Sequence, residues 1–151
     1  MKLTFLIISI ILCLVLNESM ISWLLAVFVG NYEVNDGFKR AFQYFTLNGY
    51  VFSLSFRAIP FIILLFLPNI LQGKLHNYIN VISWFWLIGI TFFITYGYWS
   101  AQHSLYTDSK TSSTYAIDFI VIPILAVAAG LISGGIGFLC AKIYREIRLR
   151  I

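Results

Sequence analysis

Long apolar stretches alternate with short polar segments along this chain of 151 residues. Each stretch is long enough to supply the roughly 20 apolar residues that a helix needs to cross a bilayer. The stretches cover residues of about 3–30, 50–71, 78–99 and 115–143. The pattern therefore predicts an all-α membrane protein with four transmembrane helices, built as a single membrane-embedded domain over residues 1–151.

The first stretch is longer than one crossing requires, and the polar tripeptide Asn17-Glu18-Ser19 lies near its middle. The halves on either side are each too short to cross a bilayer alone. We therefore expect one tilted or partly protruding helix over residues 3–30. The N-terminal sequence MKLTFLIISIILCLVL has the basic tip and apolar core of a signal peptide, but no A-x-A-like cleavage site follows, so we interpret it as a retained span.

The composition supports a membrane location. Apolar residues make up 60% of the chain, aromatic residues 18% and charged residues only 11%, a balance that a soluble domain of this size could not bury in one core. No separate soluble domain fits beside four spans. Cys13 and Cys140 lie in apolar stretches far apart in the sequence, so they indicate neither a zinc site nor a redox pair.

The distribution of basic residues predicts the orientation. Six lie in the segments on the side of both termini: Lys2, Lys74, Lys142, Arg145, Arg148 and Arg150. Three lie in the connections on the other side: Lys39, Arg40 and Lys110. Because Lys and Arg are enriched in cytoplasmic segments, both termini are expected to be cytoplasmic. The aromatic residues Trp84 and Trp86, and Tyr96, Tyr98 and Trp99, fall near the two ends of the third span and are interpreted as interfacial belts.

A short interfacial helix is expected over residues 37–46, on the outer surface. Phe38, Phe42 and Phe45 recur at i, i+4 and i+7, and Lys39, Arg40 and Gln43 lie on the other face. Asp36 and Gly37 would cap this helix. The alternative is an irregular loop whose phenylalanines dip into lipid.

Three ionisable residues lie within or just inside the spans: Glu18, Arg57 and Asp118. A charge at the bilayer centre costs about 2.5–3.5 kcal/mol on insertion scales, so each needs a partner, water or an interfacial position. The helical rise places Glu18 and Arg57 at similar depths in the outer half of the core, which allows an intramembrane ion pair between the first two spans. The alternatives are a polar path for an ion or proton, and independent snorkelling of the two side chains.

Asp118 is interpreted as a helix-start acid. It follows Ser112, Ser113 and Thr114, and an acid in the first turn interacts favourably with the helix dipole. Thr114 would be the N-cap, although a contact between Asp118 and Arg57 or an outside partner is also open. Pro60 and Pro123 are expected to bend their spans.

Small residues form two helix-packing ridges on the last span. One ridge contains Ala129, Ser133, Gly137 and Ala141, and the other contains Ala126, Gly130 and Gly134. Such ridges allow another helix to approach closely, and we expect that helix to be another span of the same chain.

The chain shows no pattern of catalytic chemistry. The sequence contains no Ser/His/Asp set, no Gly-rich phosphate loop and no carboxylate cluster, so we expect neither enzyme activity nor a cofactor. His76 and His103 have no second ligand at metal spacing, are expected in opposite loops, and predict no metal site. The basic tail next to a span favours anionic lipid over nucleic acid as its partner.

The segment from Ser112 to Leu125, SSTYAIDFIVIPIL, resembles a pattern of small, mostly uncharacterised bacterial inner-membrane proteins, in which a Ser-Ser-Thr cap leads into an apolar span with an early proline. The acid at Asp118 departs from that pattern, where a small or apolar residue is expected. This resemblance implies a location in the bacterial inner membrane and no particular activity. Four short spans, short loops and a basic tail are also similar in architecture to membrane immunity proteins against pore-forming toxins.

We therefore expect a non-enzymatic, multi-pass membrane protein that acts through protein contacts in the bilayer, such as an immunity or accessory subunit. Its partners would be the lipid bilayer and a membrane protein or toxin, and it could form homo-oligomers. The alternative is a small transporter or channel component that uses Glu18, Arg57 and Asp118. Transport predicts a water-accessible cavity containing all three side chains, whereas a binding protein predicts a dry bundle with an exposed helical face.

Overall fold

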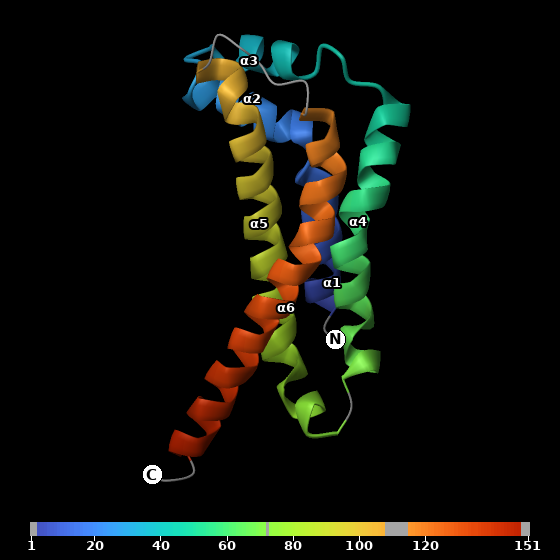
Figure 1. Ribbon diagram of the computed structural model, residues 1–151, viewed down its shortest axis with the longest axis vertical. Helices are drawn as coiled ribbons and strands as arrows, with labels where there is room; N and C mark the ends of the chain where they lie inside the picture. The colour runs from blue at the N-terminus through green and yellow to red at the C-terminus, as the bar shows by residue number, and fades with distance from the viewer. Residues whose placement is uncertain (1–2, 72, 108–114, 149–151) are drawn as a thin grey trace.

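The computed structural model describes residues 3–71, 73–107 and 115–148, and these residues are almost entirely helical. Their elements are α1 (Leu3–Val15), α2 (Glu18–Phe28), α3 (Val34–Ala41), α4 (Leu47–Ile70), the 3-10 helix η1 (Gly73–Tyr78), α5 (Ile79–Thr107) and α6 (Tyr115–Arg148). No strand occurs within these ranges. Figure 1 shows α4, α5 and α6 as the long helices of a bundle. The predicted all-α class is confirmed.

Three helical segments are long and apolar enough to cross a membrane: Leu47–Ile70, Leu75–His103 and Ile117–Arg148. The number rises to four if α1 and α2 together count as one bent span. Much of the surface of these helices is apolar, with exposed residues such as Phe66, Phe92 and Ile132.

The expectation of one continuous helix over residues 3–30 is wrong. The chain breaks between Val15 and Glu18, and the axes of α1 and α2 differ by 69°. With 13 residues, α1 is about 20 Å long, which is shorter than a hydrocarbon core of about 30 Å. Figure 1 shows α1 inside the bundle, whereas α2 lies with α3 across one end of it.

A short helix follows α2, as expected, but its predicted bounds and cap are wrong. It covers Val34–Ala41 instead of residues 37–46, its N-cap is Glu33, and Asp36 lies in its first turn. Gly37 is buried because α3 packs on α2 at this point, and an added side chain would meet Val27 and Ala26 of α2. The close approach of α2 therefore favours a small residue at this position. Phe42 is the C-cap, and its ring stacks on Phe38 and contacts Phe45.

The helix ends fall into two groups in Figure 1. The first turn of α1, the 3-10 helix η1 and the last turn of α6 lie toward one end of the bundle. The opposite end of the bundle contains helix α3, the start of α4, the end of α5 and the start of α6. Thr114, the expected N-cap of the last span, is outside the described residues, but Asp118 does lie in the first turn of α6.

The most extensive helix packing is between α5 and α6, which cross each other in Figure 1. The buried row on α6 consists of Ala126, Gly130, Gly134 and Gly137, whereas Ala129, Ser133 and Ala141 are only half-buried. A Cβ atom added at Gly130 would lie 2.6 Å from the indole of Trp86, and one at Gly137 would lie 2.8 Å from Phe85. The small residues therefore face another helix of the same chain. Pro60 and Pro123 lie inside continuous helices.

Two residues interpreted as interfacial belts belong to the interior instead. Trp86 and Tyr98 are 3% and 1% exposed, whereas Trp84 and Tyr96 on the same helix are 42% and 62% exposed. The glycines of α6 leave room for the Trp86 indole, and this packing against α6 removes Trp86 from the surface. Tyr98 belongs to the buried apolar core, where its ring meets that of Phe119 edge-on.

Candidate functional site

The break between α1 and α2 leaves polar backbone groups in the middle of an apolar stretch. The last carbonyl groups of α1 and the first N–H groups of α2 have no partners within their own helices. An unpaired backbone group in an apolar environment costs about as much as a lost hydrogen bond. The break can persist only if other groups satisfy these atoms.

Asn17, in the break itself, supplies several of the missing partners. Its side-chain oxygen accepts a hydrogen bond of 2.9 Å from the backbone N–H of Met20 and so caps the start of α2. Its amide nitrogen Nδ2 lies 3.4 Å from the carbonyl oxygens of both Leu14 and Val15, at the end of α1. One side chain thus serves both helix ends.

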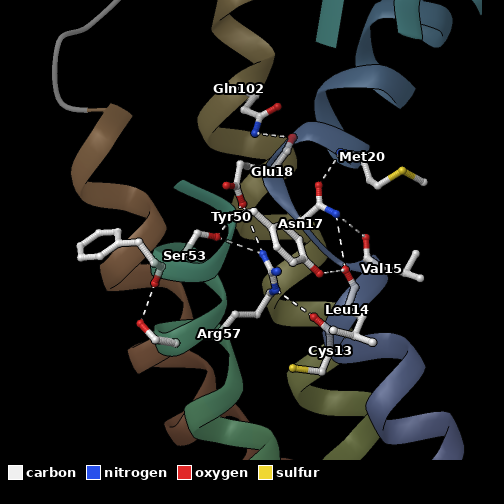
Figure 2. Close-up of polar contacts among 12 residues, drawn as sticks. Cys13, Leu14, Val15, Asn17, Glu18, Met20, Tyr50, Ser53, Arg57 and Gln102 are labelled. Carbon is white, nitrogen blue, oxygen red and sulfur yellow. Dashed lines mark hydrogen bonds and ion pairs between the residues drawn. The ribbon is translucent and has the colours of Figure 1, made fainter. Parts of the chain in front are cut away.

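Arg57 of α4 reaches the same break from a neighbouring helix, and its side chain is fully buried. Its Nε donates a hydrogen bond of 2.9 Å to the carbonyl oxygen of Cys13. Its Nη1 lies 3.1 Å from the hydroxyl of Ser53 and 3.3 Å from Oε2 of Glu18. The Ser53 hydroxyl in turn donates to the same Glu18 oxygen at 2.9 Å. Figure 2 shows this network around the α1–α2 break.

Two more side chains complete the cluster (Figure 2). The Tyr50 hydroxyl donates to the carbonyl of Leu14 at 3.0 Å, and the Arg57 guanidinium lies 5.4 Å from the centre of the Tyr50 ring. Gln102 of α5 donates from Nε2 to the backbone carbonyl of Glu18 at 3.0 Å. Helices α4 and α5 are therefore both tied to the break.

The charges in this cluster match the helix ends beside them. Arg57 lies at the C-terminal end of α1, where the helix dipole is negative, and Glu18 is the first residue of α2, where it is positive. Each interaction between a charge and a helix end adds to the attraction between Glu18 and Arg57. The side chain of Glu18 is 19% exposed, while that of Arg57 is 0% exposed. The cluster therefore holds a bent helix in a defined shape.

Some buried polar atoms of the cluster have no hydrogen-bond partner among the described residues: Nη2 of Arg57, the Tyr98 hydroxyl and Oε1 of Gln102. The Tyr98 hydroxyl is close enough to interact electrostatically with Arg57, although the two groups do not meet the distance and angle of a well-formed hydrogen bond. These three groups retain the capacity to form further hydrogen bonds inside the bundle.

The structure brings Glu18 and Arg57 together but places Asp118 elsewhere. Asp118 lies in the first turn of α6, and no ion pair joins it to Arg57 among the described contacts. Sequence reasoning missed the other members of the cluster: Asn17, Tyr50, Ser53, Tyr98 and Gln102. A signal was available for two of them. Ser53 precedes Arg57 by four residues, which places both on one helical face, and Asn17 directly precedes Glu18 as N-caps often precede an acid.

A pocket of about 410 Å³ opens beside the cluster. Its walls come from α2, the end of α3 and the connection that follows it, the first turns of α4, and the start of α6. They are Glu18, Ser19, Ala41, Tyr44, Phe45, Thr46, Gly49, Tyr50, Phe52, Ser53, Phe56, Phe119 and Ile120. Of the three ionisable residues singled out from the sequence, Glu18 lines this pocket, while Arg57 and Asp118 are not among its described walls.

Among the described residues, no group of three or more His, Cys, Asp or Glu side chains is placed to hold a metal ion. His76 lies in η1 and His103 lies within α5, not in a loop as expected. No protein-family model, curated protein or solved structure matches the chain.

Proposed function

We propose that the chain is a non-enzymatic integral membrane protein that acts by binding a helix of another membrane protein within the bilayer. Its long apolar helices and their exposed apolar side chains support insertion, since water would solvate that surface poorly. A bacterial inner membrane is the location that the resemblance of residues 112–125 implies. An immunity or accessory subunit is the class of role that fits.

The proposed orientation places both termini in the cytoplasm. The bundle end near the start of α1, η1 and the end of α6 carries the larger group of basic residues, including Lys142, Arg145 and Arg148. The opposite end carries Lys39 and Arg40 in α3. Because Lys and Arg favour the cytoplasmic side, α3 and the α5–α6 connection would face outward.

This orientation predicts the behaviour of reporter fusions. An alkaline phosphatase fused after Ile151 should be inactive, because that reporter folds only after export, and a fluorescent protein fused there should be bright. The same phosphatase inserted after Asn31, between α2 and α3, should be active. An active C-terminal phosphatase or an inactive insertion after Asn31 would contradict the topology.

The observation that carries the binding function is a groove between α5 and α6 on the outside of the bundle. Its volume is about 420 Å³, and its surface is almost wholly apolar. Small residues, Gly89, Ala128, Ala129 and Ser133, form much of it, and Phe92 and Ile132 stand beside them as large exposed residues. A floor of small residues between bulky walls fits the side-chain ridge of another membrane helix.

The cluster at the α1–α2 break argues for the same function and against the transport alternative. A transport site would place Glu18, Arg57 and Asp118 around one accessible cavity. Instead, Arg57 is fully buried and its Nε and Nη1 donors are directed at Cys13, Ser53 and Glu18. These contacts hold the bent helix in its shape. The groove between α5 and α6, by contrast, is open to a partner.

Site-specific photocrosslinking tests the binding of a partner helix. A photoreactive residue at Ile132, 68% exposed in the groove, should give a protein adduct of defined mass in cells of the natural host. Ala128→Trp should abolish that adduct, because the indole would fill the groove. The control is the same photoreactive residue at Phe66 of α4, which is 57% exposed and lies outside the groove. Adducts with lipid alone, or equal adducts from both positions, would contradict the proposal, and an adduct of two copies of this chain would make the partner a second copy.

A further inference from the structure

The pocket beside Glu18 has the composition of a binding site for a positively charged, partly apolar molecule. We propose that it binds the ammonium group of an amphipathic amine, with the charge against the Glu18 carboxylate and the hydrocarbon part among the surrounding phenylalanine side chains. The pocket volume of about 410 Å³ falls within the range of about 300–1,000 Å³ that is common for small-molecule sites.

The charge of the ligand follows from the pocket walls. Glu18 is the one charged side chain among the described wall residues. Its Oε2 receives Arg57 and Ser53, and Figure 2 shows the second carboxylate oxygen pointing away from Arg57. The side chain of Glu18 is 19% exposed and lines the pocket, so a donor that enters the pocket can reach its carboxylate. A carboxylate with a free oxygen accepts an N–H group of a cation.

Aromatic side chains from several parts of the chain line the same pocket as that carboxylate. The wall includes Tyr44, Phe45, Tyr50, Phe52, Phe56 and Phe119, which come from three separate parts of the chain. The faces of aromatic rings attract cations, and sites for quaternary ammonium groups are commonly built from such rings. One acid among several aromatic side chains therefore favours an organic ammonium ion over an anion or a neutral sugar.

The Arg57 charge does not prevent this binding. Arg57 lies behind Glu18, with no exposed surface, and its Nε is directed at the Cys13 carbonyl. A cation in the pocket would contact the carboxylate directly, while the guanidinium would be further away. Because the Coulomb interaction falls with distance, attraction to the nearer Glu18 exceeds repulsion from Arg57.

The position of the pocket indicates where the amine comes from. It lies at the end of the bundle where the α3–α4 connection and the first turn of α4 meet the start of α6. In a bilayer this end would be near the headgroups, and the gap beside Phe52 and Phe56 would lie deeper. Two sources share the required chemistry: the ammonium headgroup of a phospholipid, and a free alkylammonium compound.

Calorimetric titration of the purified full-length chain in a neutral maltoside detergent tests the proposal. The soluble probe is octylammonium, kept below its micelle concentration, and octyl sulfate is the anionic probe of equal chain length. Phosphatidylethanolamine and phosphatidylglycerol, compared by native mass spectrometry, form the corresponding lipid pair. At least one ammonium probe should bind about tenfold or more tightly than its anionic counterpart, as expected for one charge-assisted contact.

Two variants separate ligand binding from folding. Glu18→Gln should weaken ammonium binding by about tenfold, because the charged acceptor is lost. As that change also affects Arg57, the second variant is Phe52→Ala, which leaves the ion pair intact and should weaken binding by about threefold. Its control is Phe66→Ala, since Phe52 and Phe66 are 59% and 57% exposed on the same helix and only Phe52 lines the pocket.

The outcomes distinguish the sources and can overturn the site. Preference for phosphatidylethanolamine over phosphatidylglycerol without binding of the soluble probe would identify a lipid headgroup, and the reverse would identify a free amine. Equal binding of cationic and anionic probes would overturn the proposal. Equal effects of Phe52→Ala and Phe66→Ala would also overturn it, whether or not Glu18→Gln folds. None of these results depends on a partner helix in the α5–α6 groove, so they leave the proposed function untouched.

Discussion

Replacing Glu18 with Ala should lower the free energy of unfolding by about 3–5 kcal/mol, and replacing Arg57 with Met should do so to a similar extent. Each single change removes one partner from an ion pair whose guanidinium is fully buried. Loss of Glu18 leaves the Arg57 charge in the interior, and loss of Arg57 leaves the Cys13 carbonyl without its donor. Unfolding in mixed micelles, followed by tryptophan fluorescence, measures both effects.

The double variant decides whether the two residues act as a pair. Because neither charge is then stranded, Glu18→Ala with Arg57→Met should lose less stability than the sum of the single losses, by about 1–3 kcal/mol. The control is the exposed pair of Lys39 and Asp36, whose side chains are 69% and 61% exposed. Lys39→Met should cost less than about 1 kcal/mol. Additive losses at Glu18 and Arg57 would show that the two charges are stabilised independently.

The sequence was sufficient to predict the long helices and insufficient to predict the break between α1 and α2. Stretches such as residues 50–71 are apolar enough to indicate a helix without knowledge of their neighbours. The break depends on Tyr50 and Arg57, which lie more than 30 residues away and satisfy the carbonyls of Leu14 and Cys13. A local pattern carries no information on such distant donors, so the apolar residues on both sides favoured one continuous helix.

The candidate site could likewise be predicted from the sequence only in part. The similar depths of Glu18 and Arg57 follow from helical rise, and the structure places these two side chains in contact. Depth says nothing, however, about the direction in which a side chain points. Tyr98 and Trp86 lie near span ends, as belt residues do, yet the packing of α5 turns both inward. Asp118 lies near a helix start, as expected. The sequence does not give the rotation of α6 about its own axis, however, and this rotation places Phe119 and Ile120, but not Asp118, in the described pocket wall.

A further large effect is expected at Gly130, where helices α5 and α6 cross. Gly130→Ala should destabilise the protein by about 1–3 kcal/mol, since the added methyl group would lie 2.6 Å from the rigid indole of Trp86 and 3.0 Å from Ile90. Gly130→Leu should cost more, because the larger side chain would force the helices apart. Apolar lipid provides no hydrophobic gain for helix association, so close packing has to supply the stability of this contact. Thermal unfolding of the purified protein measures the loss.

Gly135 on the same helix provides the matched control, because an added Cβ atom there meets no atom within 4 Å. Alanine is favoured over glycine inside a helix by about 0.5–1 kcal/mol, so Gly135→Ala should leave stability unchanged or raise it slightly. The same substitution, five residues apart, should thus have effects of opposite sign, because only Gly130 faces α5 at the crossing. Equal effects at Gly130 and Gly135 would mean that the Trp86 indole does not pack against Gly130. The small residues of α6 would then stabilise the chain only through contacts with lipid or with another molecule.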